Sequence, residues 1–219
     1  MEDYFTTKPS APENLVAKGG YREVSLSWTG SFLAAEYMLY RSSSQGGPYE
    51  KIGTTAGTTF SDAGLWDGET YYYVCRAINV AGESENSSEA SAITIPPIPM
   101  GLTATGGTQS VLLSWNPSNG ASSYEVFRSS ASGGPYTTPE NLPTGTLWLD
   151  TGLSDGTRYY YIVRAVNASG ESGDSSEVTS ITIPPVPTGL TATGGTGYIA
   201  LSWTASTGAD FYRVSSATT

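Results

Sequence analysis

Short alternations of apolar and polar residues recur along the chain, and turns containing glycine or proline separate them. Val24–Trp28 alternates in this way, and so does Tyr71–Ala77. A period of two is expected of a β-strand that buries one face. The i, i+3, i+4, i+7 spacing of an amphipathic helix does not occur in the sequence. The pattern therefore predicts an all-β protein.

The same succession of strands and turns returns at intervals of roughly 90 residues, which is the size of a small domain rather than of a solenoid unit. We expect two complete repeats, residues 9–95 and 96–183, each folded as a sandwich of seven strands in two sheets. A partial repeat, residues 184–219, contains only the first three strands, A to C. The marker of each repeat is a Leu-Ser-Trp strand, at residues 26–28, 113–115 and 201–203.

Proline-rich junctions join the repeats, at Ile95–Pro99 and Ile183–Pro187. Proline fixes its own φ and keeps the preceding residue extended. Each junction should therefore be a stiff step rather than a flexible hinge. The N-terminal residues 1–8 faintly resemble the last strand of a preceding repeat, because aligning the first repeat with the second places Thr7 on Thr94.

Further residues in each repeat support a resemblance to a known family. A proline-flanked first strand precedes the Leu-Ser-Trp strand, and a tyrosine follows in the third strand. A leucine six residues before another tyrosine then resembles the tyrosine corner of the fibronectin type III domain. The matching residues are Pro12, Leu15, Tyr37, Leu65 and Tyr71 in the first repeat and Pro99, Leu102, Tyr124, Leu153 and Tyr159 in the second.

The resemblance implies tandem immunoglobulin-like β-sandwiches of the kind found beside bacterial secreted carbohydrate enzymes. It also implies a core signature, formed by Trp28, Trp115, Trp203, Leu65, Tyr71, Leu153 and Tyr159. Cys75 aligns with Val163, so we interpret its thiol as a small buried hydrophobic group rather than a reactive one.

Charge and composition narrow the function classes. The net charge is −10 and the sequence contains no histidine. A chain this acidic would be repelled by nucleic acid and by an anionic membrane surface. The missing imidazole removes the commonest general base and a common zinc ligand. We predict no enzymatic activity, no catalytic residue, no metal and no cofactor, and we expect neither nucleic-acid binding nor membrane insertion.

Recurring aspartates are candidates for a calcium site or an acid–base pair, because Asp62 and Asp67 return as Asp150 and Asp155. Two of them belong to Asp-Gly turns, where aspartate bonds its own backbone. EF-hand spacing and a third clustered ligand are also missing from the sequence. Structural roles are the preferred interpretation.

Outward-facing aromatic residues are the candidate ligand surface. Alternation places Tyr72 and Tyr160 outward, and it places Tyr40 and Phe127 on the same outer face. Such rings stabilise a sheet by cross-strand pairing, and they could also stack on sugar rings.

The loop before the last strand is the adhesive position of some family members, which carry Arg-Gly-Asp there. This chain has Gly82–Ser84 and Gly170–Ser172 instead, so an ordinary polar hairpin turn is preferred.

The leading hypothesis is a non-enzymatic extracellular spacer or adhesive module. Its partners would be other domains of a parent protein or neighbouring subunits. One alternative is an accessory carbohydrate-binding module of a secreted polysaccharide-degrading enzyme, with polysaccharide as its partner. A second alternative is a filament subunit that assembles through the incomplete terminal repeat. Met1–Asp3 is acidic where a signal peptide would be basic. We therefore expect an extracellular or cell-surface protein, and either its export is signalled elsewhere or the chain is a piece of a longer secreted protein.

Overall fold

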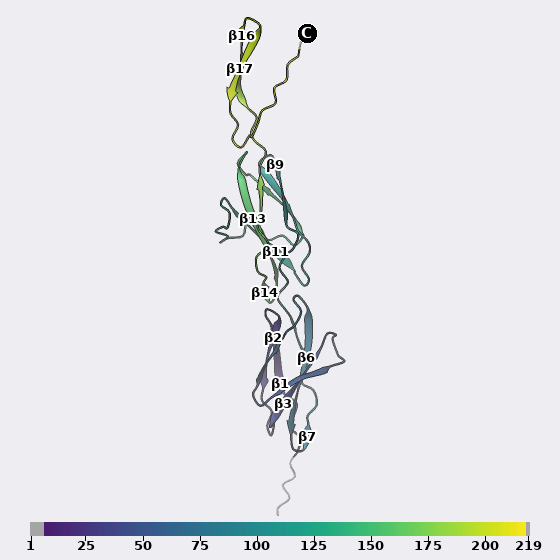
Figure 1. The fold of residues 1–219 in the computed structure, drawn as a ribbon. Coiled ribbons are helices and arrows are strands. Elements are labelled where there is room, and N and C mark those ends of the chain that lie inside the picture. Colours follow the sequence, from purple (N-terminus) through teal and green to yellow (C-terminus); the bar gives the residue numbers. More distant parts are fainter. Residues whose placement is uncertain (1–6, 218–219) are drawn as a thin grey trace, which may run out of the picture. The chain divides into compact units, whose positions relative to one another are not determined.

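The computed structural model describes residues 7–217, and every regular element within this range is a β-strand (Figure 1). This agrees with the alternating pattern of the sequence. The chain divides into two compact units. The first unit contains the described residues up to Ile98 together with two loops of the second repeat, Ser118–Ser123 and Ala165–Gly173. The described range includes no helix that could cross a membrane.

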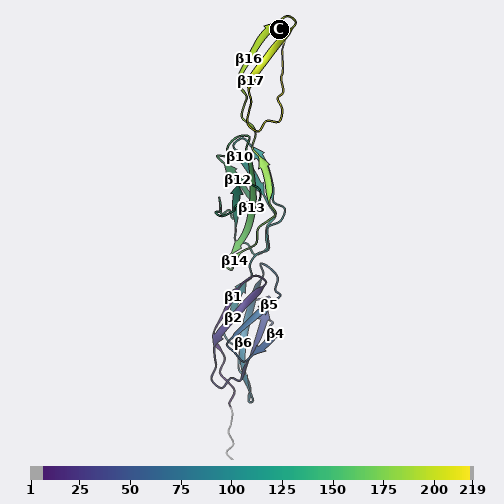
Figure 2. The ribbon, with the colours of Figure 1, turned by 60° about the vertical axis from the view of Figure 1, so that its left-hand side comes forward.

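The first repeat is a sandwich of two antiparallel sheets (Figures 1 and 2). One sheet has the order β1-β2-β5, and the other has the order β4-β3-β6-β7 with β8 also paired to β6. Its strands are β1 (Glu13–Gly19), β2 (Glu23–Thr29), β3 (Glu36–Ser42), β4 (Glu50–Thr55), β5 (Thr59–Ala63), β6 (Thr70–Asn79), β7 (Gly82–Glu83) and β8 (Ala90–Ile93).

The last strand of this sandwich is broken into β7 and β8, and serines bridge the gap. The backbone N–H of Ser84 donates to the carbonyl of Ala77 at 2.8 Å, and that of Ser87 donates to Cys75 at 2.8 Å. The two serine hydroxyls in turn accept the N–H groups of Ala77 and Cys75. Strand β6 therefore keeps its hydrogen bonds although its neighbour is irregular.

The second repeat has the same two-sheet arrangement. One sheet has the order β12-β10-β9, and the other has the order β11-β13-β14 with β15 paired to β13. The strands are β9 (Thr103–Gly107), β10 (Ser110–Ser114), β11 (Ser123–Ser129), β12 (Leu147–Thr151), β13 (Arg158–Asn167), β14 (Gly170–Glu171) and β15 (Val178–Ile181). The serine bridge recurs at Ser172 and Ser175.

The expectation of seven strands in each repeat needs one correction. The second repeat has no counterpart of β4 within its described residues, and only an isolated bridge between Val126 and Asn141 remains. Pro139 and Pro143 flank this bridge. Because proline has no N–H to donate, the segment cannot form a continuous strand along β11.

Equivalent residues fill the two cores. Every second residue of β6 points inward, and the same positions of β13 do so. The most deeply buried apolar residues, each at most 2% exposed, include Val24, Leu26, Leu39, Tyr73, Cys75 and Ala77 in the first repeat and Val111, Leu113, Val126, Tyr161, Val163 and Ala165 in the second.

The start of each repeat requires a left-handed backbone conformation two residues after its proline. Asn14 has φ 55°, and Gly101 and Gly189 both have φ 67°. Only glycine and asparagine adopt this region readily. In the first and third segments, a β-bulge follows in the strand pairing, between Glu13 and Val16 and again between Thr188 and Thr191. The three segments therefore share a backbone conformation at their start, in addition to equivalent core residues.

The third segment forms one hairpin, β16 (Thr188–Gly195) with β17 (Tyr198–Thr204). The expected third strand around Tyr212 is not formed within the described residues. In both complete repeats the corresponding strand pairs with β6 or β13, and the third segment contains no such neighbour up to residue 217. The prediction that residues 1–8 resemble a last strand falls largely on residues 1–6, which lie outside the described range.

Candidate functional site

In the first repeat, Tyr40 of β3 and Tyr72 of β6 are half-buried on the outer face of the larger sheet. The register pairs Tyr40 with Val74 and Ser42 with Tyr72, which places both rings on that face. The guanidinium of Arg76 lies 4.9 Å from the centroid of the Tyr40 ring. The stacked cation lies over one face of the Tyr40 ring, a face that a sugar would otherwise be able to contact.

The second repeat departs from the prediction at Phe127, which is only 2% exposed. Phe127 is therefore not a ligand-facing aromatic residue. The guanidinium of Arg164 lies 4.6 Å from its ring centroid, and Asp174 holds that guanidinium through an ion pair. Tyr160 is half-buried at the position equivalent to Tyr72. Of the four predicted ligand-facing rings, the structure therefore leaves Tyr40, Tyr72 and Tyr160 partly exposed and buries Phe127.

A second pair of tyrosines, in the Gly-Gly-Pro-Tyr turns, was not predicted as a candidate site. Tyr49 donates its hydroxyl proton to Glu89, which also accepts the N–H of Gly46 at 2.8 Å. Burial and then the Glu89 carboxylate raise the pKa of Tyr49 to about 12. The only sequence signal was that both the tyrosine and the glutamate recur in each repeat.

In the second repeat, the same turn is held by Glu177. This carboxylate accepts hydrogen bonds from the hydroxyl of Tyr136 at 2.5 Å, from the N–H of Gly133 at 2.7 Å and from the hydroxyl of Ser132 at 2.8 Å. These donors, Tyr136 first, lower the pKa of Glu177. The carboxylate fixes a turn to the start of the last strand.

The recurring aspartates have separate structural roles. Asp62 is buried and accepts hydrogen bonds from the Arg41 guanidinium at 3.0 Å and from the Tyr73 hydroxyl at 2.9 Å. Burial, followed by the nearby carboxylate of Asp62, raises the pKa of Tyr73. Asp67 does not take part in this cluster; its carboxylate lies 4.0 Å from Arg22.

The second repeat builds the same cluster from Arg128, Asp150 and Tyr161, with 2.9 Å contacts to Asp150. Asp155 lies apart and accepts the backbone N–H of Gln109. Residues 7–217 contain no group of three or more potential metal-ligating side chains. Asp62 and Asp150 each join the two sheets through arginine and tyrosine donors, whereas Asp67 and Asp155 lie apart from these clusters.

The core signature residues occupy interior positions in the two complete repeats. Trp28 packs edge-on against Tyr37 at a centroid distance of 5.4 Å, and Trp115 packs in the same way against Tyr124 at 5.3 Å. Leu65, Tyr71 and Leu153 are buried, and Tyr159 is half-buried. The hydroxyls of both corner tyrosines accept a backbone N–H at 3.1 Å, from Trp66 and Ser154 respectively. Cys75 is fully buried, and desolvation raises its pKa to about 12.

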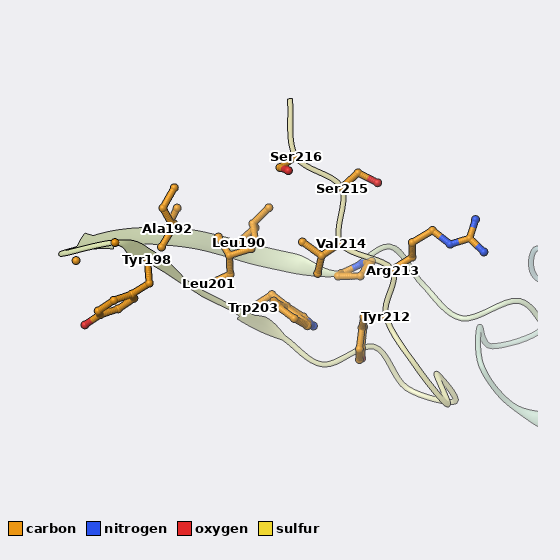
Figure 3. A pocket seen from close by; sticks show the side chains of 14 residues that line it. Leu190, Ala192, Tyr198, Leu201, Trp203, Tyr212, Arg213, Val214, Ser215 and Ser216 are labelled. Atoms are coloured by element: carbon orange, nitrogen blue, oxygen red, sulfur yellow. The ribbon is translucent and has the colours of Figure 1, made fainter. Parts of the chain in front are cut away.

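A hollow of about 1010 Å³ lies on the third segment (Figure 3). Trp203 and Tyr212 line it with a centroid distance of 5.3 Å, which matches the core pairs of the complete repeats. Leu201 is 39% exposed there, whereas its counterpart Leu26 is 2% exposed. The hollow is therefore the inner face of a sheet with core residues, and not a shaped ligand pocket.

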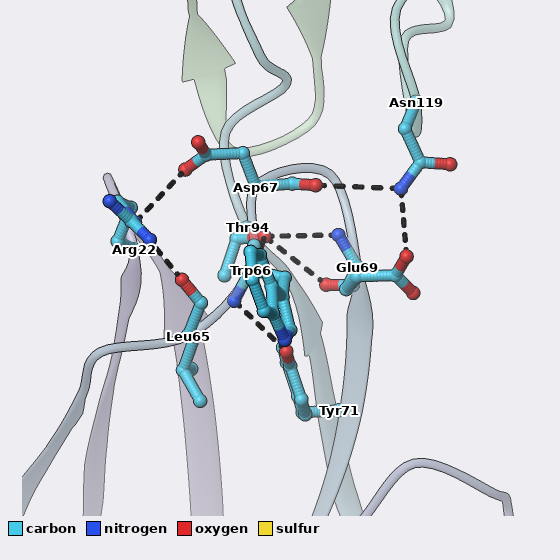
Figure 4. A network of polar contacts seen from close by, with 8 residues as sticks. All are labelled: Arg22, Leu65, Trp66, Asp67, Glu69, Tyr71, Thr94 and Asn119. Atoms are coloured by element: carbon cyan, nitrogen blue, oxygen red, sulfur yellow. Dashed lines mark hydrogen bonds and ion pairs between the residues drawn. The ribbon is translucent and has the colours of Figure 1, made fainter.

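The corner of the first repeat also anchors the start of the linker (Figure 4). The Thr94 hydroxyl donates to the carbonyl of Trp66 at 2.7 Å and accepts the N–H of Glu69 at 3.1 Å. The next residue, Ile95, donates its N–H to Gly20 at 3.0 Å, and its carbonyl accepts the N–H of Gly68 at 2.9 Å.

The second linker is anchored in the same way. The Thr182 hydroxyl donates to the carbonyl of Ser154 at 2.7 Å and accepts the N–H of Thr157 at 2.9 Å. Ile183 donates to Gly107 at 2.9 Å and accepts from Gly156 at 3.1 Å. Each proline-rich junction therefore begins at a Thr-Ile pair that is fixed by hydrogen bonds to the threonine hydroxyl and to the isoleucine backbone.

These features define an immunoglobulin-like β-sandwich module with a tyrosine corner. Residues 97–182 match the family model of the fibronectin type III domain, so the second repeat is a fibronectin type III domain. Amylopullulanase of Thermoanaerobacterium saccharolyticum is 43% identical over 98 residues, which cover 43% of this chain and 7% of that protein. Exoglucanase B of Cellulomonas fimi is 30% identical over 184 residues, which cover 75% of this chain and 16% of that protein.

Among solved structures, a Fn3-like protein from Clostridium thermocellum is 33% identical with a TM-score of 0.36; the match covers 40% of this chain and 93% of that protein. The chain thus spans only a small part of the curated relatives named above. The chain is thus similar to short segments of an amylopullulanase and an exoglucanase, both of which are polysaccharide-degrading enzymes by name.

Proposed function

We propose that this chain is a non-enzymatic extracellular spacer within a larger protein, with residues 9–95, 96–183 and 184–219 as its successive units. The observation that carries the proposal is the repeated linker anchor. Two linkers with the same Thr-Ile-Pro-Pro sequence start from residues that are hydrogen-bonded in the same way. Each linker is held by hydrogen bonds where it leaves its sandwich and then continues as polyproline-like backbone. Because such backbone is stiff, we expect the linker to act as a spacer and not as a flexible hinge.

The chemistry of the side chains supports a non-catalytic role. The buried carboxylates Asp62 and Asp150 are occupied by arginine and tyrosine donors. The Cys75 thiol is buried and has a raised pKa, so it is a poor nucleophile at neutral pH. The proposed partners are the other domains of the parent protein.

Backbone ¹⁵N relaxation on the intact chain tests the spacer. We expect Ile95 and Ile183 to have order parameters near those of the strands, about 0.85, and values below about 0.6 would contradict the proposal. Thr94→Val is the informative variant because it removes the hydroxyl contacts to Trp66 and Glu69 while keeping a similar volume. It should increase motion at Ile95 and leave Ile183 unchanged.

A second candidate function, polysaccharide binding, is favoured by the half-exposed Tyr72 and Tyr160 and by the names of the relatives. Affinity electrophoresis in gels containing starch, soluble cellulose, chitin or xylan derivatives tests it. Retardation that is lost in a Tyr72→Ala/Tyr160→Ala double variant supports binding. Phe32→Ala, which removes an exposed aromatic residue elsewhere, is the matched control. Unchanged migration in every gel argues against it.

The adhesive role and assembly into a filament stay predictions from the sequence. Analytical ultracentrifugation of the intact chain and of a variant that lacks residues 188–219 distinguishes assembly from its absence. Association that disappears with the deletion supports a filament, and two monomeric samples argue against it.

A further inference from the structure

The turn between the sixth and last strands contains an asparagine whose carboxamide contacts an incoming chain segment. In the first repeat, Asn79 Nδ2 donates to the carbonyl of Thr7 at 2.8 Å and to that of Leu33 at 3.2 Å. Its Oδ1 accepts the backbone N–H of Ala81 at 2.8 Å. One side chain therefore closes its own turn and joins a preceding segment to the loop before β3.

The second repeat makes the same three contacts within the first compact unit. Asn167 Nδ2 donates to the carbonyl of Thr94 at 2.8 Å and to that of Gly120 at 3.2 Å, while its Oδ1 accepts the N–H of Ser169 at 2.8 Å. Asn167 is buried, so loss of a partner would leave a polar group without water.

The segments that the two asparagines hold share a sequence. Thr7-Lys8-Pro9 contacts Asn79, and Thr94-Ile95-Pro96 contacts Asn167. Pro9 and Pro96 are both buried. The second residue of each segment lies over a turn glycine: a Cβ at Gly82 would lie 3.0 Å from Lys8 Cε, and one at Gly170 would lie 3.3 Å from Ile95 Cδ1.

We propose that this Asn-x-x-Gly turn is a binding site for an extended Thr-x-Pro segment that leaves a preceding sandwich. The asparagine carboxamide donates to the threonine carbonyl, and the glycine leaves room for the side chain of the residue that comes after the threonine. The second turn adds a bond, because the Ser169 hydroxyl donates to the carbonyl of Ile93, a contact that Ala81 cannot make in the first. The turn at the family's adhesive position thus serves the chain's own linker.

The proposal rests on the spacer role and deepens it, because it assigns the residues of the second repeat that contact the linker at its anchor, Thr94 and Ile95. Asn167→Asp is the sharpest variant. It keeps an oxygen for the N–H of Ser169 but replaces the donor with an acceptor that faces two carbonyls. Asn79→Asp is the matched change in the first repeat, where it should affect Lys8 and leave the junction at Ile95–Pro99 unchanged.

Hydrogen exchange and relaxation on the intact ¹⁵N-labelled chain supply the readouts. We expect the carboxamide protons of Asn79 and Asn167 to exchange about tenfold or more slowly than those of the exposed Asn86, whose oxygen rather than nitrogen is bound by Arg76. Asn167→Asp should lower the order parameters of Ile95 and Ile98. Asn167→Ala provides a second variant if the charged one fails to fold.

Three outcomes would overturn the proposal. Carboxamides of Asn79 and Asn167 that exchange as fast as that of Asn86 exclude the contact, as does a linker whose motion is unchanged by both Asn167 variants. In those cases an ordered Ile95 would leave the spacer role intact. A linker that is already mobile in the unmodified chain would overturn the spacer role and this inference together.

Discussion

In the first repeat, the outer face of strands β2 and β5 is mainly polar, and Ser25 pairs directly with Ser61. The equivalent pair in the second repeat is Leu112 with Leu149, which are 41% and 50% exposed, and Leu147 beside them is 62% exposed. The buried residues of the same strands barely differ between the repeats. Interior positions must interlock with the opposite sheet, whereas the outer face is free to change.

The second difference between the repeats concerns the edge of the larger sheet. Strand β4 pairs with β3 in the first repeat, whereas the second repeat has only an isolated bridge between two prolines. Glu140, in this irregular segment, forms an ion pair with Arg128 at 3.1 Å. The two repeats therefore share an interior and differ on their surfaces, so we expect any difference in their partners to come from the surfaces.

The largest expected effect is the loss of a core ring in either repeat. Trp28→Ala and Trp115→Ala should each destabilise their own repeat by about 3–5 kcal/mol, and Leu153→Ala by about 2–5 kcal/mol. Denaturant unfolding followed by NMR assigns the loss to one repeat. Trp203→Ala is the control, because its hairpin lacks a second sheet within the described residues. An effect below about 1 kcal/mol at Trp28 or Trp115 would contradict the shared core.

A smaller effect is expected at the buried ion pairs. Asp62→Asn and Asp150→Asn keep the side-chain shape and remove the charge from a hydrogen-bonded pair, which costs about 1.5–3 kcal/mol. The loss should be smaller for Asp150→Asn, because Glu140 still faces Arg128. Equilibrium unfolding of the two variants and of Glu140→Gln/Asp150→Asn checks this order. Equal losses in both single variants would show that Glu140 gives no compensation.

The exposed leucines should matter little for stability. Leu147→Thr and Leu149→Ser, which install the residues of the first repeat, should change the free energy of unfolding by no more than about 0.5 kcal/mol each. If the leucines mark a contact surface, the double variant should weaken self-association or partner binding in sedimentation experiments. The reverse changes, Thr59→Leu and Ser61→Leu, test whether that property transfers to the first repeat.

The smallest effect is a dependence on pH in one turn of the second repeat. The hydrogen bond from Tyr136, followed by those from Gly133 and Ser132, lowers the pKa of Glu177 below its usual value of 4.5. The stabilisation of the turn is therefore present above that value and is lost as the pH falls through the lower pKa of the folded state. NMR titration of the Glu177 carboxyl should show the low pKa, and Tyr136→Phe should raise it. An unchanged titration in that variant would contradict the assignment.

Local patterns were sufficient to predict the sandwich, because period-two alternation indicates strands with one buried face, whereas the core tryptophans and the tyrosine corner were implied by the resemblance to the fibronectin type III family. Local patterns were insufficient for Phe127, which alternation places on the outer face but which is 2% exposed beneath the Arg164 guanidinium that Asp174 pairs with from another segment. The third strand expected near Tyr212 could not be judged from local pattern either, because such a strand forms only beside a neighbouring strand, and the described part of the third segment supplies none for it. The asparagine contacts join residues more than 70 positions apart, beyond the reach of local pattern.

Cys75 gives the first repeat a chemical label that the second repeat lacks. It is the only cysteine in the chain, it is fully buried, and valine occupies the equivalent position in the second repeat. A thiol reagent can react only when the first sandwich opens, because the folded thiol is both inaccessible and protonated. The rate at which a thiol reagent modifies the unaltered chain therefore measures the opening of the first repeat alone, because the second repeat contains no thiol.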